Sequence, residues 1–166
     1  LDGLMSARSN DLCGIVNGLD YDDWNPETDN RIAKNFNISN FRKNKPVNKT
    51  CLQEELGLEK DPKVMMIGMV SRLTDQKGFD LVDYMMDELC QDAVQIVVLG
   101  TGDVKYENMF RHFAWKYSGR VSANIYYSDE LSHRIYASCD AFLMPSLFEP
   151  CGLSQLMSLR YGTLPI

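Results

Sequence analysis

The chain has 166 residues, of which 45% are hydrophobic and 24% charged, an ordinary composition for one globular domain with its own core. Its 17 basic and 23 acidic residues give a net charge of −6, which argues against general binding to nucleic acids or anionic membranes. The longest apolar runs are too short to span a bilayer, and no signal peptide is expected. Five scattered cysteines without a C-x-x-C pair favour a reducing, cytoplasmic compartment over a disulfide framework or a structural zinc site.

The first part of the chain is rich in Asn, Asp and Pro and has weak periodicity, so we expect residues 1–50 to be a hinge or linker segment. Six basic residues and no acidic one occur from Arg31 to Thr50. Such a run is usually a solvated connecting segment, and a landing surface for a polyanion is the alternative. Asp20-Tyr21-Asp22 matches a D-x-D pattern that can hold a divalent metal, but its polar surroundings favour a solvated turn, and no metal is expected.

From Lys63 onward, short apolar runs alternate with stretches of helical spacing. The apolar runs predict strands at residues 64–70, 94–99, 121–127, 141–144 and 163–166. The helical spacing predicts helices at residues 78–90, 106–117, 131–138 and 152–161. This alternation predicts an α/β fold, a doubly wound, Rossmann-like parallel sheet with helices on both faces in three α/β/α layers.

In such a sheet, ligands bind outside the carboxyl ends of the strands. The segments at those ends contain cations, small residues, an aromatic ring and a carboxylate; they are residues 71–78, 100–103, 127–129 and 145–152. Since all four segments meet at one rim of the sheet, this rim is expected to bind an anionic ligand with a flat ring.

Arg72 and Lys77 flank the turn that follows the first strand. A guanidinium fork and an ammonium point charge complement a diphosphate, although two solvent-exposed cations are equally compatible with the position alone. Gly100-Thr101-Gly102 resembles the start of a dinucleotide fingerprint that lacks its third glycine, because residue 105 is Lys. It is either a strand-to-helix turn or a place where a ligand approaches the backbone.

Glu149 precedes the start of the helix predicted at residues 152–161. The carboxylate either favours the helix dipole or faces a ligand, while the free N–H groups of Gly152, Leu153 and Ser154 receive a phosphate or a sugar hydroxyl. Cys151 has no obvious base, because His112 and His133 lie in predicted helices and are interpreted as structural.

Together these segments resemble bacterial glycogen synthases and plant starch synthases, which are ADP-glucose-dependent GT-B glycosyltransferases. The resemblance covers nearly the whole chain and rests on residues 14–26, 70–78, 99–102, 132–135, 145–156 and 161–165. The S-R-L-T-x-Q-K-G and F-E-P-C-G-L segments, in this order, are its most specific parts. Many other GT-B enzymes carry a second glutamate eight residues after the first, whereas Met157 stands there in this chain, as in the glycogen synthase branch.

The resemblance implies a two-domain enzyme with its active site in a cleft, of which residues 51–166 are the donor-binding half, truncated at its carboxyl end. Arg72, Lys77 and Glu149 would be catalytic, with both cations on the leaving diphosphate and Glu149 on the donor glucose. The donor would also be bound by residues of the four loops: Gly100, Thr101, Gly102, Tyr127, Cys151, Gly152, Leu153 and Ser154. Tyr127 would stack on adenine.

The activity that the resemblance implies is transfer of glucose from ADP-glucose to the non-reducing end of an α-1,4-glucan, with retention and without a metal or other cofactor. The amino-terminal domain of the same enzyme and the glucan would be the partners, and this chain alone is expected to be inactive. The alternatives are a nucleotide-binding module of another GT-B enzyme, a non-catalytic binding module and a nicotinamide-dependent oxidoreductase.

Overall fold

A computed structural model describes all 166 residues and contains one five-stranded parallel sheet with the strand order β3-β2-β1-β4-β5. The strands are β1 (Met65–Val70), β2 (Val94–Leu99), β3 (Val121–Asn124), β4 (Ala141–Phe142) and β5 (Leu164–Pro165). β1 pairs with β2 from Met65↔Val94 to Val70↔Leu99, and with β4 on its other side. The predicted doubly wound parallel sheet is therefore confirmed, and the order of the strands reverses between β1 and β4.

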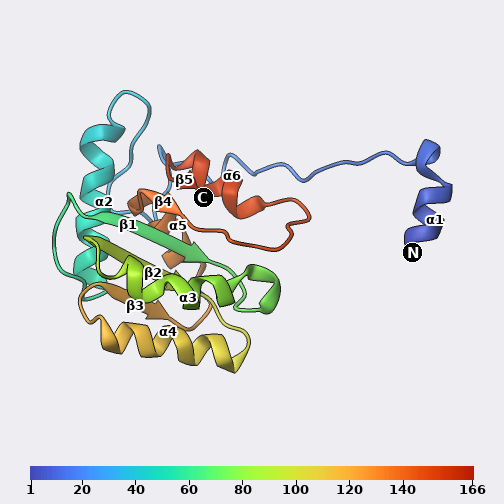
Figure 1. Ribbon diagram of the computed structural model, residues 1–166. Coiled ribbons are helices and arrows are strands. Elements are labelled where there is room, and N and C mark those ends of the chain that lie inside the picture. The colour runs from blue at the N-terminus through green and yellow to red at the C-terminus, as the bar shows by residue number, and fades with distance from the viewer.

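Helices cover both faces of the sheet, as Figure 1 shows. Alternating side chains of β2 supply the two cores, since Ile96 and Val98 join one apolar cluster and Val97 and Leu99 join the other. The first cluster contains buried residues of α3 (Phe79–Leu89) and α4 (Val104–Lys116). The second contains residues of α2 (Phe41–Glu55) and α5 (Asp129–Ser138). α6 (Leu153–Arg160) lies beside α5 and β5, which completes the predicted three layers.

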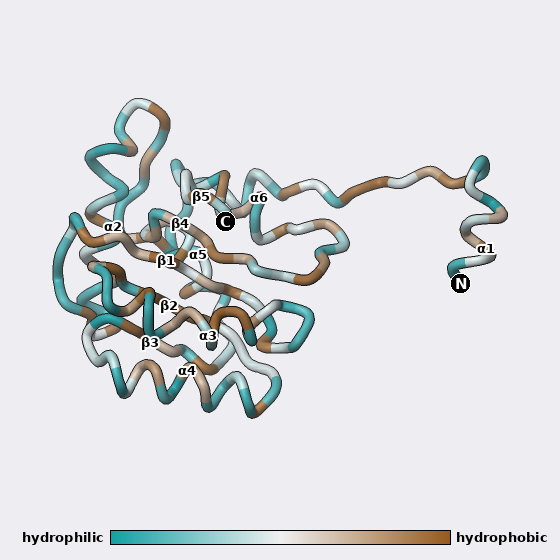
Figure 2. Tube along the Cα trace, in the orientation of Figure 1, coloured by the Kyte–Doolittle hydropathy of each residue, from teal (hydrophilic) through white to brown (hydrophobic).

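The hydropathy pattern agrees with this arrangement, because the strands carry the most hydrophobic residues and the outer sides of the helices the most hydrophilic (Figure 2). Phe79, Val82 and Met86 are the buried residues of α3, at the helical spacing seen in the sequence. None of the helices is both long enough and apolar enough to cross a membrane.

The third strand is shorter than predicted and ends at Asn124, so Tyr127 lies in the loop that follows it. The next helix begins earlier than predicted, at Asp129, because the Ser128 hydroxyl accepts a hydrogen bond from the Leu131 N–H at 3.1 Å and caps it. These two shifts place Tyr127 and Ser128 together at the rim of the sheet.

The amino-terminal region is partly helical and partly packed on the sheet. α1 (Asp2–Ala7) lies away from the other elements (Figure 1) and buries no residue. α2 was not predicted, and it runs through residue 50 without a break, so the predicted division at residues 50 and 51 does not coincide with a structural boundary. Helix α2 contains Pro46 and packs against α5.

Of two lysines of α2, Lys49 is buried and Lys45 is partly buried, so the interpretation of residues 31–50 as a solvated segment is wrong for them. The Lys45 ammonium donates to the carbonyl oxygens of Tyr136, Ala137 and Tyr161 and to Thr163 Oγ1 at 2.8–3.2 Å, and burial lowers the pKa of Lys45 to about 8. Lys49 pairs with Asp140 at 2.6 Å. The ammonium groups bind oxygens left free at helix ends and beside a strand, which explains why cations lie inside the protein.

Candidate functional site

A pocket of about 300 Å³ opens at the carboxyl ends of β1 and β2, next to the place where the strand order reverses. Open α/β sheets bind ligands at this place. Five of the residues predicted for the site line it: Arg72, Gly100, Thr101, Tyr127 and Ser154. Three further lining residues, Ser71, Ser128 and Asp129, belong to the loop segments predicted at this rim. The remaining lining residues were not predicted for the site: Trp24, Val70, Leu99, Tyr126, Ser132, Tyr136 and Met157.

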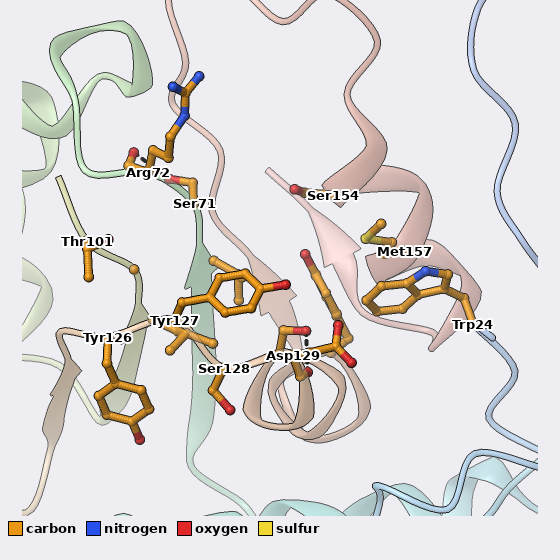
Figure 3. A pocket seen from close by; sticks show the side chains of 15 residues that line it. Trp24, Ser71, Arg72, Thr101, Tyr126, Tyr127, Ser128, Asp129, Ser154 and Met157 are labelled. Atoms are coloured by element: carbon orange, nitrogen blue, oxygen red, sulfur yellow. Dashed lines mark hydrogen bonds between the residues drawn. The ribbon is translucent and has the colours of Figure 1, made fainter.

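The side chains around the pocket differ in direction, as Figure 3 shows. The Tyr127 ring points across the pocket towards the side where Trp24 lies, whereas the ring of Tyr126, which also lines the pocket, points in another direction. Arg72 is exposed, and its guanidinium forms no ion pair within the chain. A free cation therefore lies at the edge of the pocket, and the Tyr127 side chain beside it is 87% exposed.

Lys77 and Glu149 lie in the two loops that flank the reversal point, after β1 and after β4. The Lys77 ammonium is 2.5 Å from Glu149 Oε1, and the same oxygen accepts a hydrogen bond from Ser146 Oγ at 2.7 Å. Both residues line a narrow second cavity that shares Val70, Ser71 and Ser154 with the main pocket. The structure thus brings the predicted ammonium and carboxylate together, next to the pocket that Arg72 lines.

The charge of Glu149 is balanced within the site. Burial alone would raise the pKa of Glu149, but the hydrogen bonds from Lys77 and Ser146 and the nearby ammonium charge lower it below its usual value. Glu149 is therefore ionised at neutral pH, and it occupies the Lys77 ammonium that a diphosphate would also attract. Any anionic ligand must share this cation with the carboxylate.

Close backbone contacts hold the loops of the site together. Gly78 has φ +71°, and a Cβ there would lie 2.0 Å from the Pro145 carbonyl oxygen, so this position fixes the Lys77 loop on the loop that leads to Glu149. A Cβ on Gly100 or Gly102 would lie 1.9 Å from the Ser71 oxygen or 2.3 Å from the Leu73 oxygen. Close packing of one loop on another therefore requires glycine at both positions, a reason that neither explanation from the sequence included.

The start of α6 offers unused hydrogen-bond donors at the same rim. Gly152 is the N-cap residue, and the helical hydrogen bonds begin at the Gln155 N–H, so the N–H groups of Leu153 and Ser154 have no helical partner. Such groups attract anions. Cys151 lies elsewhere: its Sγ is 3.7 Å from the Asn17 carbonyl oxygen, and the residue lines neither cavity.

Sequence reasoning missed a buried polar network that connects the amino-terminal segment to the site. The Asp29 carboxylate, whose side chain is fully buried, accepts hydrogen bonds from Tyr161 Oη at 2.6 Å and Arg31 Nε at 2.9 Å, and lies 2.8 Å from His133 Nδ1. Burial opposes its ionisation, but the hydrogen bonds of His133, Tyr161 and Arg31 hold the pKa of Asp29 well below its usual range. The structural role expected for His133 is confirmed, and His112 is exposed on α4.

The D-x-D segment forms the turn that was predicted. Asp20 Oδ1 accepts a hydrogen bond from the Asp22 N–H at 2.9 Å, and both aspartates are exposed. No group of three or more His, Cys, Asp or Glu side chains in the chain is placed to hold a metal ion.

A doubly wound parallel sheet with cations, free amide groups and an aromatic ring at its reversal point is an arrangement with which proteins of the α/β class bind nucleotides. The model of the family described as "Glycosyl transferases group 1" matches residues 51–166. The chain belongs to this glycosyltransferase family, which argues against the oxidoreductase alternative.

Individual relatives show which members of this family the chain is similar to. The chain is 72% identical to a glycogen synthase of Lachnospira eligens and 67% identical to one of Lachnoclostridium phytofermentans, in each case over all of this chain and 35% of the relative. It is also similar to the catalytic domain of starch synthase IV from Arabidopsis thaliana bound to ADP and acarbose, with a TM-score of 0.89 and 35% identity over 98% of this chain and 34% of that one. The chain thus spans about a third of the length of these relatives.

Proposed function

We propose that this chain forms the donor-binding part of a glucosyltransferase that uses ADP-glucose to extend an α-1,4-glucan with retention of configuration, as in glycogen synthesis. The observation that carries the proposal is the convergence of Arg72, the Lys77–Glu149 pair and the start of α6 on one rim of the sheet. The relatives named glycogen synthase, and the starch synthase structure that contains ADP, support the choice of donor and acceptor.

In this proposal the cations act on the leaving group. Transfer of glucose leaves negative charge on the departing ADP, and cations already in place stabilise that charge in the transition state. Arg72 brings an unpaired guanidinium, and Lys77 brings an ammonium that is held at a fixed position by Glu149. The free N–H groups of Leu153 and Ser154 add donors for phosphate oxygens, so these groups supply the charge stabilisation without a metal.

Glu149 contacts the donor glucose, and Tyr127 stacks on the adenine. The carboxylate is ionised and only partly exposed, so it presents an acceptor of fixed position for sugar hydroxyls. The Tyr127 ring is exposed over the pocket, as a stacking residue must be before its ligand binds. Gly100, Thr101 and Gly102 shape the pocket beside the nucleotide, and Gly152 is the N-cap of α6. A contact of Cys151 with the donor stays a prediction, because this residue lines neither cavity.

The remaining parts of the proposal concern the whole enzyme. Because the curated relatives are about three times as long as this chain, we propose that a second domain supplies the glucan surface and completes the cleft. The five free cysteines of this chain agree with a reducing, cytoplasmic setting.

A titration of the chain with ADP, ADP-glucose and UDP by calorimetry tests the donor. We expect saturable binding of both adenine nucleotides and weaker binding of UDP, because the Tyr127 ring stacks more surface of a purine than of a pyrimidine. Equal binding of ADP and UDP contradicts the adenine preference, and no binding of either contradicts the nucleotide site.

Two variants of the ion pair test the roles of its members. Lys77→Ala removes a charge-assisted contact and also leaves Glu149 unneutralised, so ADP binding should weaken by roughly 1.5–3 kcal/mol. Glu149→Gln frees the Lys77 ammonium, and ADP binding should then be retained or strengthened. Lys116→Ala is the control, because Lys116 pairs with Asp87 at the end of α4. An unchanged affinity in Lys77→Ala would show that this lysine does not contact the diphosphate.

A further inference from the structure

A tryptophan from outside the family-matched region forms part of the pocket wall. Trp24 lines the main pocket beside Met157, on the side opposite Tyr127 (Figure 3). It precedes the sheet by about forty residues in the sequence, and the family match begins only at residue 51. The site is therefore built from two separate parts of the chain.

The position of Trp24 is fixed by its neighbours. Its indole stacks on the His133 imidazole with ring centroids 3.8 Å apart and an interplanar angle of 9°, and its edges meet Tyr136 and Tyr161. The Trp24 carbonyl oxygen accepts a hydrogen bond from Arg160 Nε at 3.0 Å. Asp29 in turn holds His133 and Tyr161. The indole is thus a rigid wall, and a ligand that meets it needs no ordering of this side chain.

The two ends of the pocket differ in character. Arg72 lies where the diphosphate is proposed to bind, while Trp24 and Met157 form an apolar wall away from the Arg72 guanidinium (Figure 3). His133 covers one face of the indole, and Trp24 also lines the pocket. A flat heterocycle or the apolar side of a ribose fits between this wall and Tyr127, whereas a phosphate does not.

We propose that Trp24 contacts the nucleoside of the bound nucleotide and, together with Tyr127, forms the two walls between which it lies. This inference rests on the proposed nucleotide site. Asp29 is a positioning residue in this arrangement, because it holds the imidazole on which the indole stacks. The amino-terminal segment, expected to be only a hinge, then contributes directly to ligand binding.

Fluorescence gives a direct test, because the chain has two tryptophans and the second, Trp115, is 77% exposed on α4. In Trp115→Phe, Trp24 is the single emitter, and ADP should change its emission with the midpoint found by calorimetry. In Trp24→Phe, Trp115 is the emitter and should not respond. A Trp115→Phe protein that binds ADP in the calorimeter without any change in emission overturns the inference and leaves the proposed function intact.

A second measurement separates ligand contact from a merely structural role. Trp24→Leu should weaken ADP binding about tenfold, in the range of one lost stacking contact, and leave inorganic pyrophosphate binding unchanged. Trp24→Phe, which keeps a ring over His133, should restore most of the ADP affinity. Equal weakening of ADP and pyrophosphate would overturn the inference, because damage to the fold affects both ligands. If ADP binds to no form of the chain, the proposed function and this inference both fail.

Discussion

The two faces of the sheet bury different kinds of side chains. The face covered by α3 and α4 is closed by a cluster of twelve buried residues that are nearly all apolar. The opposite side, where α2, α5 and the amino-terminal segment pack, also buries Asp29, His133 and Lys49 and partly buries Lys45. Burial of apolar residues follows the period of each helix, whereas burial of these polar groups depends on partners that are distant in the sequence.

The largest loss of stability is expected from a substitution on the apolar face. Phe110 is fully buried, and its ring lies 5.3 Å from the Phe79 ring. Phe110→Ala removes this packing and leaves a cavity, so the free energy of unfolding should fall by about 4 kcal/mol in denaturant titrations. Tyr84→Ala on the exposed side of α3 should change it by less than about 0.5 kcal/mol. A small effect at Phe110 would mean that this face does not form one packed core.

A substitution on the polar face should lower the free energy of unfolding nearly as much, and this loss should depend on pH. Asp29→Asn removes the charge that His133, Tyr161 and Arg31 surround, and we expect a loss of about 3 kcal/mol at pH 7. Asp22→Asn in the exposed turn is the matched control.

The pH dependence follows from the pKa of Asp29. Because this pKa is depressed in the folded protein, its contribution to stability is present above the unfolded value of about 3.9 and is lost as the pH falls through the folded pKa. The difference in unfolding free energy between the wild type and Asp29→Asn should therefore shrink below about pH 4. A constant difference from pH 7 to pH 3 would contradict the assignment of an ionised Asp29.

This contrast also explains how much the sequence could predict. The strands and helices from residue 64 onward could be predicted, because apolar runs and helical spacing report burial directly. The loops at their ends could be placed at one rim from the topology alone, which brought Arg72, Lys77, Tyr127 and Glu149 to the same region.

The remaining features of the fold and the site could not be predicted from local sequence patterns. Helix α2 has little apolar periodicity, since two of its buried residues are lysine and asparagine, so it was missed. Lys45 and its acceptor Thr163 are 118 residues apart, and Trp24 and His133 are 109 apart, so no spacing rule connects them. Residues 14–26 carry part of the family resemblance, but only the folded chain places Trp24 at the pocket.

The smallest effect concerns the rim, where two adjacent tyrosines follow β3. The resemblance assigned the stacking role to Tyr127 and not to its neighbour Tyr126. In the structure both residues line the pocket, but the Tyr127 ring points across it, whereas the Tyr126 hydroxyl lies 3.4 Å from Asn124 Oδ1. Tyr127→Ala should weaken ADP binding by about 1–2 kcal/mol through the loss of one stacked ring, without changing stability, because the ring is exposed.

Tyr126→Ala is the matched control for this prediction, since it removes the same ring one residue away, and it should leave ADP binding within about 0.5 kcal/mol of the wild type. Calorimetric titration of both variants with ADP shows which of the two tyrosines contributes to binding. If Tyr126→Ala weakens binding more than Tyr127→Ala does, the loop after β3 presents its other ring to the nucleotide. Tyr126 would then be the residue that stacks on the nucleotide, and the assignment of this role to Tyr127 would be wrong.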